Sequence, residues 1–217
     1  TPTQITKKIL YSAWLMKGAG LLLAVFFLNF YFILLYFLGI ACSYVYSHKS
    51  IRAKSYPFLS IFFGIGSGGA IFLAGALLGE MEINIRLIMG MLVAGLFLSS
   101  FHIITQIYET RDDKKRKDNT IALLYGKRAT LMLSLLFFIF AGVICVSLFF
   151  LMNFHFYIIA GVSAYFLLVI YLMFSWIHRE PESDLKDYHI VKYFIPYLTL
   201  IAYLAILLMY LYSVPQL

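Results

Sequence analysis

The chain has 217 residues, of which 63% are hydrophobic and only 12% are charged, and its mean hydropathy is +0.90. A soluble domain of this size has too little interior for so much apolar surface, so the composition indicates an integral membrane protein. The formal net charge of +7 comes from short segments between apolar runs. That pattern is typical of membrane topology and argues against a nucleic-acid-binding face.

Seven apolar runs follow one another along the chain, each close to the roughly 20 residues that a membrane-spanning helix requires. We therefore predict an all-α integral membrane fold with seven transmembrane helices, at residues 9–28, 30–47, 57–79, 84–104, 129–152, 154–177 and 191–212. Very short turns at Asn29 and Asn153 indicate two antiparallel helix pairs. The chain opens on Thr1-Pro2 rather than Met, so we expect residues 1–217 to be a single transmembrane domain truncated at its N-terminus.

The third run carries a concentration of small residues, Gly64-Ile-Gly-Ser-Gly-Gly69, followed by Gly75 and Gly79. Small residues on one helix face allow two helix backbones to approach closely, so this run predicts tight packing against a neighbouring helix. The run lies inside an apolar span with no strand before it, which argues against a nucleotide-binding loop.

The distribution of cations predicts how the chain is oriented. If seven helices alternate, the basic segments around residues 7–8, 49–54, 111–128 and 179–192 all fall on one side. The opposite side carries only Arg86, beside Glu80 and Glu82. By the positive-inside rule the basic side is cytoplasmic, so we expect a multi-pass protein of the inner or plasma membrane with these segments facing the cytoplasm.

A polar island interrupts the apolar pattern between Gln106 and Thr120. It holds five cations and four carboxylates, and the carboxylates belong to Glu109, Asp112, Asp113 and Asp118. If the fourth helix continues past residue 104, Glu109 and Asp113 form an i, i+4 pair on one face. Mg²⁺ prefers one or two carboxylates completed by phosphate oxygens and water, so the four acids are candidate metal ligands. The cations at residues 114–117 could neutralise the negative charge of a bound diphosphate that the metal leaves uncompensated.

A less specific interpretation exists for each of these features. The island could be a solvated loop whose charges only set topology, and Tyr108 could be an interfacial anchor. The basic segment from Tyr46 to Lys54 has the same topological alternative. The acidic and basic segment 179–192 is either a lid or a linker, and the sequence does not decide between them.

Two stretches of this chain resemble motifs of the UbiA family of intramembrane prenyltransferases. Gln106-Ile-Tyr-Glu-Thr-Arg-Asp-Asp113, followed by the run from Lys117 to Gly126, resembles the second aspartate-rich motif of that family. Tyr46-Ser47, then Ile51-Arg-Ala-Lys54 and Pro57, resembles the stretch between its fourth and fifth helices. Both stretches occur in the family's order and with matching helix spacing, so the resemblance covers essentially the whole chain.

The resemblance implies a bundle of nine helices around a central cavity, in which the seven helices predicted here correspond to the third through ninth. The first aspartate-rich motif would precede Thr1, so we expect this fragment alone to be inactive. The chain departs from the family pattern at three places. Glu109 stands where Asp is usual, Lys117 where Gly is common, and the usual Pro between Ser47 and Arg52 is missing.

The function implied is Mg²⁺-dependent transfer of an isoprenyl group from an allylic polyprenyl diphosphate to a hydrophobic acceptor, such as an aromatic quinone precursor or a polyene. By the resemblance the catalytic residues are Asp112, Asp113, Arg52 and Lys54. The diphosphate would be bound by Lys49, Arg52, Lys54, Tyr108, Lys114 and Lys117. Besides its two substrates the protein would contact membrane lipid and no nucleic acid. The sequence specifies neither prenyl chain length, nor acceptor, nor oligomeric state.

The competing hypothesis is a non-catalytic membrane protein, a transporter or an assembly subunit, whose charged loop binds a partner. Transporters usually carry ionisable residues near the middle of the membrane. The predicted spans here hold almost none, apart from His102 near the end of one helix. This distribution favours a site at the mouth of the bundle over a translocation path.

Overall fold

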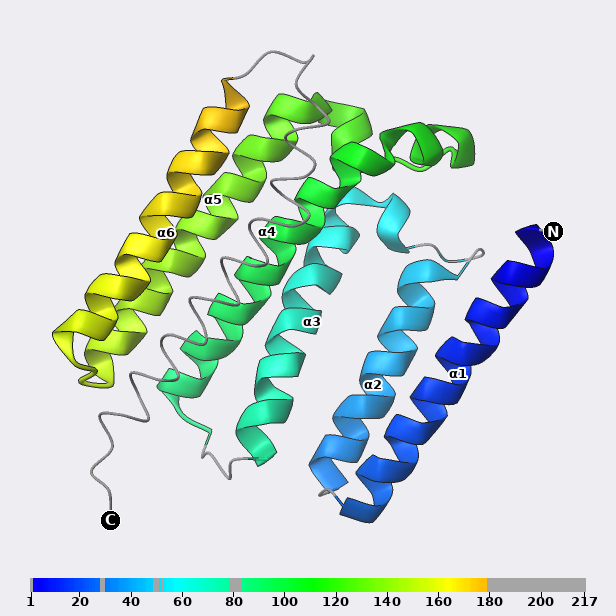
Figure 1. The fold of residues 1–217 in the computed structure, drawn as a ribbon, viewed down its shortest axis with the longest axis horizontal. Coiled ribbons are helices and arrows are strands. Elements are labelled where there is room, and N and C mark those ends of the chain that lie inside the picture. Colours follow the sequence, from blue (N-terminus) through cyan, green and yellow to red (C-terminus); the bar gives the residue numbers. More distant parts are fainter. Residues whose placement is uncertain (1, 28–29, 49–50, 52, 79–82, 179–217) are drawn as a thin grey trace.

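The computed structural model describes residues 2–27, 30–48, 51, 53–78 and 83–178, and all regular structure in this part of the chain is helical (Figure 1). It comprises α1 (Pro2–Phe27), α2 (Phe30–Ser47), the short 3-10 helix η1 (Ala53–Ser55), α3 (Pro57–Leu78), α4 (Ile85–Arg116), α5 (Ile121–Leu151) and α6 (Phe156–Ile177). The predicted all-α class is therefore confirmed for these residues. The seventh predicted helix, at 191–212, lies outside them, as does segment 179–192.

Four of these helices, α3 to α6, are long and apolar enough to cross a membrane. Their outward faces are apolar as well: Phe58 and Phe62, one turn apart on α3, are 81% and 72% exposed. Such exposure suits contact with lipid. Helices α1 and α2 have shorter apolar segments, Tyr11–Phe26 and Phe30–Tyr46. An integral membrane architecture is thus supported, while seven spans and their numbering are not confirmed.

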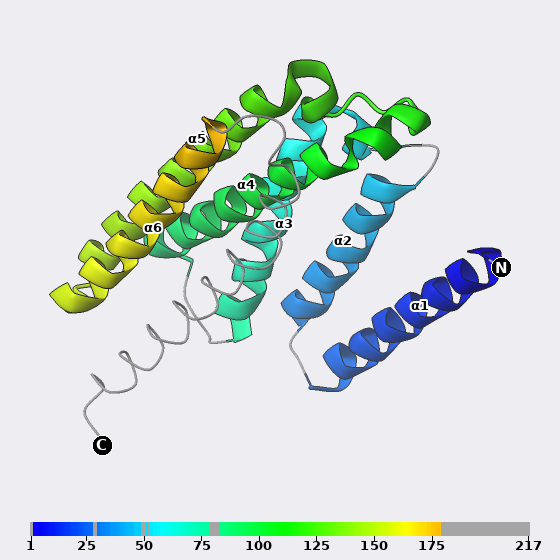
Figure 2. The ribbon, with the colours of Figure 1, turned by 45° about the horizontal axis from the view of Figure 1, so that its top comes forward.

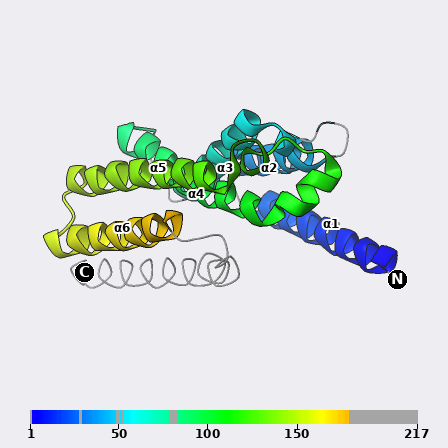
Figure 3. The same cartoon turned by 90° about the horizontal axis from the view of Figure 1, so that it is seen from above.

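The helices follow one another in chain order across Figure 1, from α1 at one edge to α6 at the other, and in the view from above α6 is drawn beneath α5 (Figure 3). The N-terminus, the α2–α3 connection and the α4–α5 connection all lie at the same end of the helices (Figure 1). We call this the charged end, because Lys54 of η1 and the acidic and basic residues at the end of α4 lie there. Which side of the membrane it faces stays a prediction.

Close packing joins α3 to α4, whose axes cross (Figure 2). A methyl group added to Gly68 would lie 2.8 Å from the Cα atom of Gly95, and one added to Gly64 would lie 3.3 Å from the Cα atom of Ser99. Only residues without a Cβ fit such a contact. The predicted role of the Gly64–Gly69 run in helix packing is therefore confirmed.

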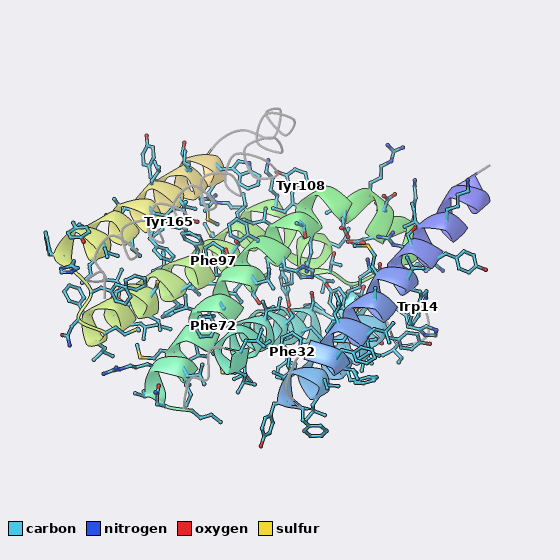
Figure 4. All side chains as sticks on the ribbon, turned by 60° about the horizontal axis from the view of Figure 1, so that its bottom comes forward. Trp14, Phe32, Phe72, Phe97, Tyr108 and Tyr165 are labelled. Atoms are coloured by element: carbon cyan, nitrogen blue, oxygen red, sulfur yellow. The ribbon has the colours of Figure 1, made fainter. Side chains whose placement is uncertain are left out.

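The core lies between α4, α5 and α6. Phe138 is completely buried at its centre, and Phe97 from α4 and Tyr165 from α6 pack against the same cluster (Figure 4). Ser100 and Ser134 join α4 to α5 by donating to each other's backbone carbonyl oxygens at 3.0 and 2.8 Å. Hydrogen bonds of this kind contribute to helix association where no water competes for the hydroxyl groups.

Helix α4 continues well past the predicted end at residue 104. Its 32 residues make it about 48 Å long at 1.5 Å per residue, whereas the hydrocarbon core of a bilayer is about 30 Å thick. The last turns, which carry the acidic and basic side chains, therefore project beyond the lipid. Helix α5 also begins earlier than predicted, at Ile121 instead of 129, and is broken at Gly126. Hydropathy detects only the apolar part of α4, so its polar extension is not predicted. The apolar start of α5 is not predicted because Gly126, Lys127 and Arg128 separate it from the long apolar run.

Candidate active site

A stripe of polar residues runs along one face of α4 towards the charged end. His102, Gln106, Glu109 and Asp113 are separated by four, three and four residues, a spacing that places them on one face of a helix. The predicted i, i+4 relation of Glu109 and Asp113 is thus confirmed, because both belong to the continuous helix α4. We refer to these four residues as the polar stripe.

Helices α2 and α3 and the 3-10 helix η1 contact the polar stripe. Tyr46 of α2 forms a hydrogen bond with the Nε2 atom of His102. The Gln106 amide donates to the hydroxyl oxygen of Ser60 on α3 at 3.1 Å. The Lys54 ammonium lies 3.8 Å from the Glu109 carboxylate. The basic segment that ends at Lys54 and the acidic end of α4 are therefore neighbours in the fold, as the two-motif interpretation requires.

Lys117 ends α4 in the left-handed conformation, with φ 59° and ψ 36°. The Asp118 N–H donates to the Asp113 carbonyl at 3.0 Å. A bond from the sixth residue of a segment back to the first is the Schellman pattern of a helix C-terminus. The Asn119 N–H then donates to the Ser55 carbonyl at 3.1 Å, which fixes the turn to η1. Left-handed backbone favours glycine, so the structure gives a physical reason for the glycine that UbiA motifs often carry at this position.

Asp113 and Asp118 are buried at the charged end, with exposed fractions of 1% and 5%. Arg116 lies between them: its Nη2 atom is 2.6 Å from Asp113 Oδ1, and its Nε atom is 3.4 Å from Asp118 Oδ2. The hydrogen bond to Asp113 raises the pKa of the Arg116 guanidinium. Arginine is protonated at physiological pH in any case, so this group is a permanent cation. The second carboxylate oxygen of Asp113, Oδ2, is buried and accepts no hydrogen bond from the residues that the structure describes.

The other predicted metal ligands are more exposed. The Glu109 side chain is 54% exposed beside Lys54, and the Asp112 side chain is 66% exposed and lies 3.7 Å from Lys115. Of the four acids, the structure thus brings Asp113 and Asp118 together through Arg116. Within the described part of the chain, no three His, Cys, Asp or Glu side chains converge in a way that could hold a metal ion. The metal role of these acids stays a prediction.

The predicted diphosphate ligands fall into four groups. Lys49 and Arg52 lie outside the described residues. Lys54 lies next to the polar stripe. Lys114, in the last turn of α4, and Lys117, which follows that turn, are exposed. Tyr108 faces a different neighbour, because its ring stacks on Trp176 of α6 with 6.3 Å between centroids (Figure 4).

Gln106 has a structural role at the start of α5 that is not predicted from the sequence. Its carbonyl oxygen accepts a hydrogen bond from the N–H of Ile121, the first residue of α5, at 3.1 Å. Thr120, at the N-cap position, makes no capping bond with its own side chain. Gln106 therefore caps α5 from α4 and positions the turn between them. A polar side chain four residues from His102 and three from Glu109, in an otherwise apolar helix, is the signal that could have revealed this role.

Gly126 breaks α5 one turn after its start, with φ 78° and ψ 172°. A side chain is strained at this φ value, which explains why the second motif ends on glycine. The helix resumes at once, and the Thr130 hydroxyl donates to the Gly126 carbonyl at 2.7 Å. The break separates the short turn that follows Asp118 from the membrane-spanning part of α5.

Comparison with known proteins agrees with these motifs. A family model described as the UbiA prenyltransferase family matches residues 4–195, a range that includes the polar stripe, η1 and the Arg116–Gly126 turn. No curated protein and no solved structure showed significant similarity. The family match extends over most of the chain, and the chain therefore belongs to the UbiA prenyltransferase family.

Proposed function

We propose that the protein transfers an isoprenyl group from an allylic polyprenyl diphosphate to a hydrophobic acceptor, an aromatic quinone precursor or a polyene, in a Mg²⁺-dependent reaction. Family membership supports prenyl transfer in a membrane. The observation that carries the proposal further is the ion pair of Lys54 with Glu109, one helical turn before the buried Asp113 on α4, at the end of an apolar bundle. A diphosphate head group with an apolar tail matches that combination of a charged end and lipid-exposed helices.

The acids fit a magnesium ion by one direct criterion. Asp113 Oδ2 is a buried oxygen without a hydrogen-bond donor, and hard oxygen atoms are the ligands that Mg²⁺ prefers. We propose that Asp113 and Asp118 offer carboxylate oxygens to a metal whose coordination is completed by phosphate oxygens and water, while the more exposed Glu109 and Asp112 contribute negative charge. Bound there, Mg²⁺ supplies the charge neutralisation that makes diphosphate a good leaving group.

The cations of the charged end bind the phosphate oxygens in this proposal. Lys54 is suited to the task because its pair with Glu109 spans 3.8 Å and both side chains are partly exposed. Such a pair contributes little to stability, so the ammonium can change partners at small cost. Lys49 and Arg52 precede Lys54 in the same segment, and Lys114 and Lys117 lie on the turn. Together they stabilise the negative charge that develops when the carbon–oxygen bond breaks.

The apolar bundle holds the prenyl chain and keeps water away from the reacting carbon. An allylic cation is stabilised by aromatic rings, each desolvated contact being worth about 1–2 kcal/mol. We propose that aromatic residues, which make up 18% of the chain, supply such contacts. We place the charged end on the cytoplasmic side, in keeping with its basic segments.

The proposal is tested with membranes that contain the protein, an isotopically labelled prenyl diphosphate and a lipid-soluble acceptor. We expect Asp113→Asn to reduce Mg²⁺-dependent transfer at least about 100-fold, the scale of losing a group that stabilises transition-state charge. Thr105→Ala is the matched control, because Thr105 is exposed on the same helix and donates to its own helix at the His102 carbonyl. Wild-type transfer by Asp113→Asn would remove Asp113 from the mechanism. No transfer by the wild type with any prenyl diphosphate would favour the non-catalytic alternative.

A further inference from the structure

Arg116 occupies the position between the two buried carboxylates of the charged end. Its contacts with Asp113 and Asp118, at 2.6 and 3.4 Å, come from a side chain that is itself 39% exposed. A buried carboxylate without a counter-charge is strongly destabilising, so these two acids require a cation whether or not a substrate is bound. Arg116 meets that requirement from within the chain.

The backbone of the turn does not depend on this side chain. The turn is held by the hydrogen bonds of Lys117 and Asp118 to the end of α4 and by the bond from Asn119 to Ser55. The guanidinium can therefore move towards solvent while both carboxylates stay in place. The other oxygen of Asp113, Oδ2, is buried and accepts no hydrogen bond from any described residue. Asp113 can therefore contact a further cation besides Arg116.

We propose that Arg116 is the resident counter-ion of Asp113 and Asp118, and that a divalent cation binds to these acids by displacing it. This inference rests on the proposed function, in which the same acids hold magnesium. The exchange replaces one cation with another, so the carboxylates are never left uncompensated. It also weakens metal binding in the absence of substrate, because the metal must first compete with an ion pair that is already formed.

The released guanidinium stays beside the site, on a turn that also carries Lys114, Lys115 and Lys117. Arginine binds phosphate oxygens in a bidentate manner, so a diphosphate gives the displaced side chain a new partner. Metal and diphosphate would then bind cooperatively, since each favours the same position of Arg116.

The experiment measures Mn²⁺ binding by electron paramagnetic resonance, and melting temperature with and without Mg²⁺, on the purified protein in detergent without diphosphate. The variants are Arg116→Gln and the matched control Lys115→Gln. Both remove one positive charge from neighbouring positions, but Lys115 pairs with the exposed Asp112 at 3.7 Å. We expect Arg116→Gln to bind Mn²⁺ about tenfold more tightly than the wild type, because a charge-assisted hydrogen bond no longer competes. Lys115→Gln should change the affinity less than about twofold.

The melting temperatures give a second readout. Without metal, Arg116→Gln should melt below the wild type because Asp113 loses its counter-charge, and Mg²⁺ should raise its melting temperature more than it raises that of the wild type. If Arg116→Gln does not fold, Arg116→Lys replaces it, and it should also bind Mn²⁺ more tightly than the wild type because it lacks the forked contact.

An affinity for Mn²⁺ that is unchanged or lower in the Arg116 variants would overturn the inference, as would an equal gain in Lys115→Gln or no binding in any protein. The inference and the proposed function can fail separately. Tighter Mn²⁺ binding without any prenyl transfer would sustain the exchange and reject the transferase activity. Prenyl transfer by the wild type, together with no gain in Mn²⁺ affinity in the Arg116 variants, would sustain the transferase activity and reject the exchange.

Discussion

Replacing Lys117 by glycine is expected to stabilise the protein, because Lys117 ends α4 with a left-handed backbone at φ 59°. A residue with a Cβ atom pays roughly 1–2 kcal/mol in this conformation. Glycine loses roughly 0.5–1 kcal/mol more backbone entropy on folding. The difference leaves a net stabilisation of about 0.5–1 kcal/mol, and the favourable interaction of cations with the helix C-terminus is retained by Lys114, Lys115 and Arg116.

Thermal unfolding in detergent measures this effect. A change of 1 kcal/mol shifts the melting temperature of a chain of this length by about 2–4 °C, so Lys117→Gly should melt about 1–4 °C higher than the wild type. Two controls separate backbone from side-chain effects. Lys117→Ala keeps the Cβ atom and should leave the melting temperature nearly unchanged. Lys115→Gly lies inside α4 and should destabilise the protein by about 1 kcal/mol.

The reasoning about Lys117 would be refuted if Lys117→Gly melted as far below the wild type as Lys115→Gly. That result would mean that the helix does not end in a left-handed residue at 117. The same variant also tests the proposed role of Lys117 in binding diphosphate. Transfer by Lys117→Gly should need a higher prenyl diphosphate concentration although the protein is more stable, a combination that a purely structural role cannot produce.

Two further predictions concern the packing around α4. Gln106→Leu leaves the Ile121 N–H without its acceptor and should cost about 1–3 kcal/mol in denaturant unfolding. A loss within about 0.3 kcal/mol of zero would show that Gln106 does not cap α5. Gly68→Leu places a side chain against the α4 backbone and should cost at least about 1–3 kcal/mol, whereas Gly66→Leu, which enters open space, should be tolerated. Equal melting temperatures for these two variants would contradict the α3–α4 contact.

The sequence predicts the apolar part of this fold closely and the polar extensions poorly. The predicted bounds 30–47 and 154–177 nearly coincide with Phe30–Ser47 and Phe156–Ile177. They agree because the length of a membrane-spanning helix equals the length of an uninterrupted apolar run, which hydropathy detects. Helix α4 extends through Gln106 to Arg116, a stretch in which Gln, Glu, Lys and Arg are good helix formers, and hydropathy does not register that preference. The start of α5 was missed because its first turn is separated from the span by Gly126.

The candidate site was also predicted from the sequence only in part. Spacing alone was enough to place Glu109 and Asp113 on one face of a helix. It could not predict that Asp113 is 1% exposed while the Glu109 side chain is 54% exposed, because burial depends on how η1 and the start of α5 dock against that face. The contact of Arg116 with both acids depends on the left-handed turn at Lys117. A glycine at position 117 would have predicted a left-handed helix end there, whereas lysine gives no such signal.

The polar stripe explains why the charged end can be positioned accurately on a membrane bundle. Tyr46, Ser60 and Ile121, from α2, α3 and α5, all form hydrogen bonds with His102 or Gln106 of α4. Polar groups beneath the membrane surface have few alternative partners, so each of these bonds favours one arrangement of the helices. Because α4 is continuous from His102 to Arg116, that arrangement also sets the positions of Glu109 and Asp113. The fold thus places Glu109 and Asp113 through one continuous helix that is anchored below them.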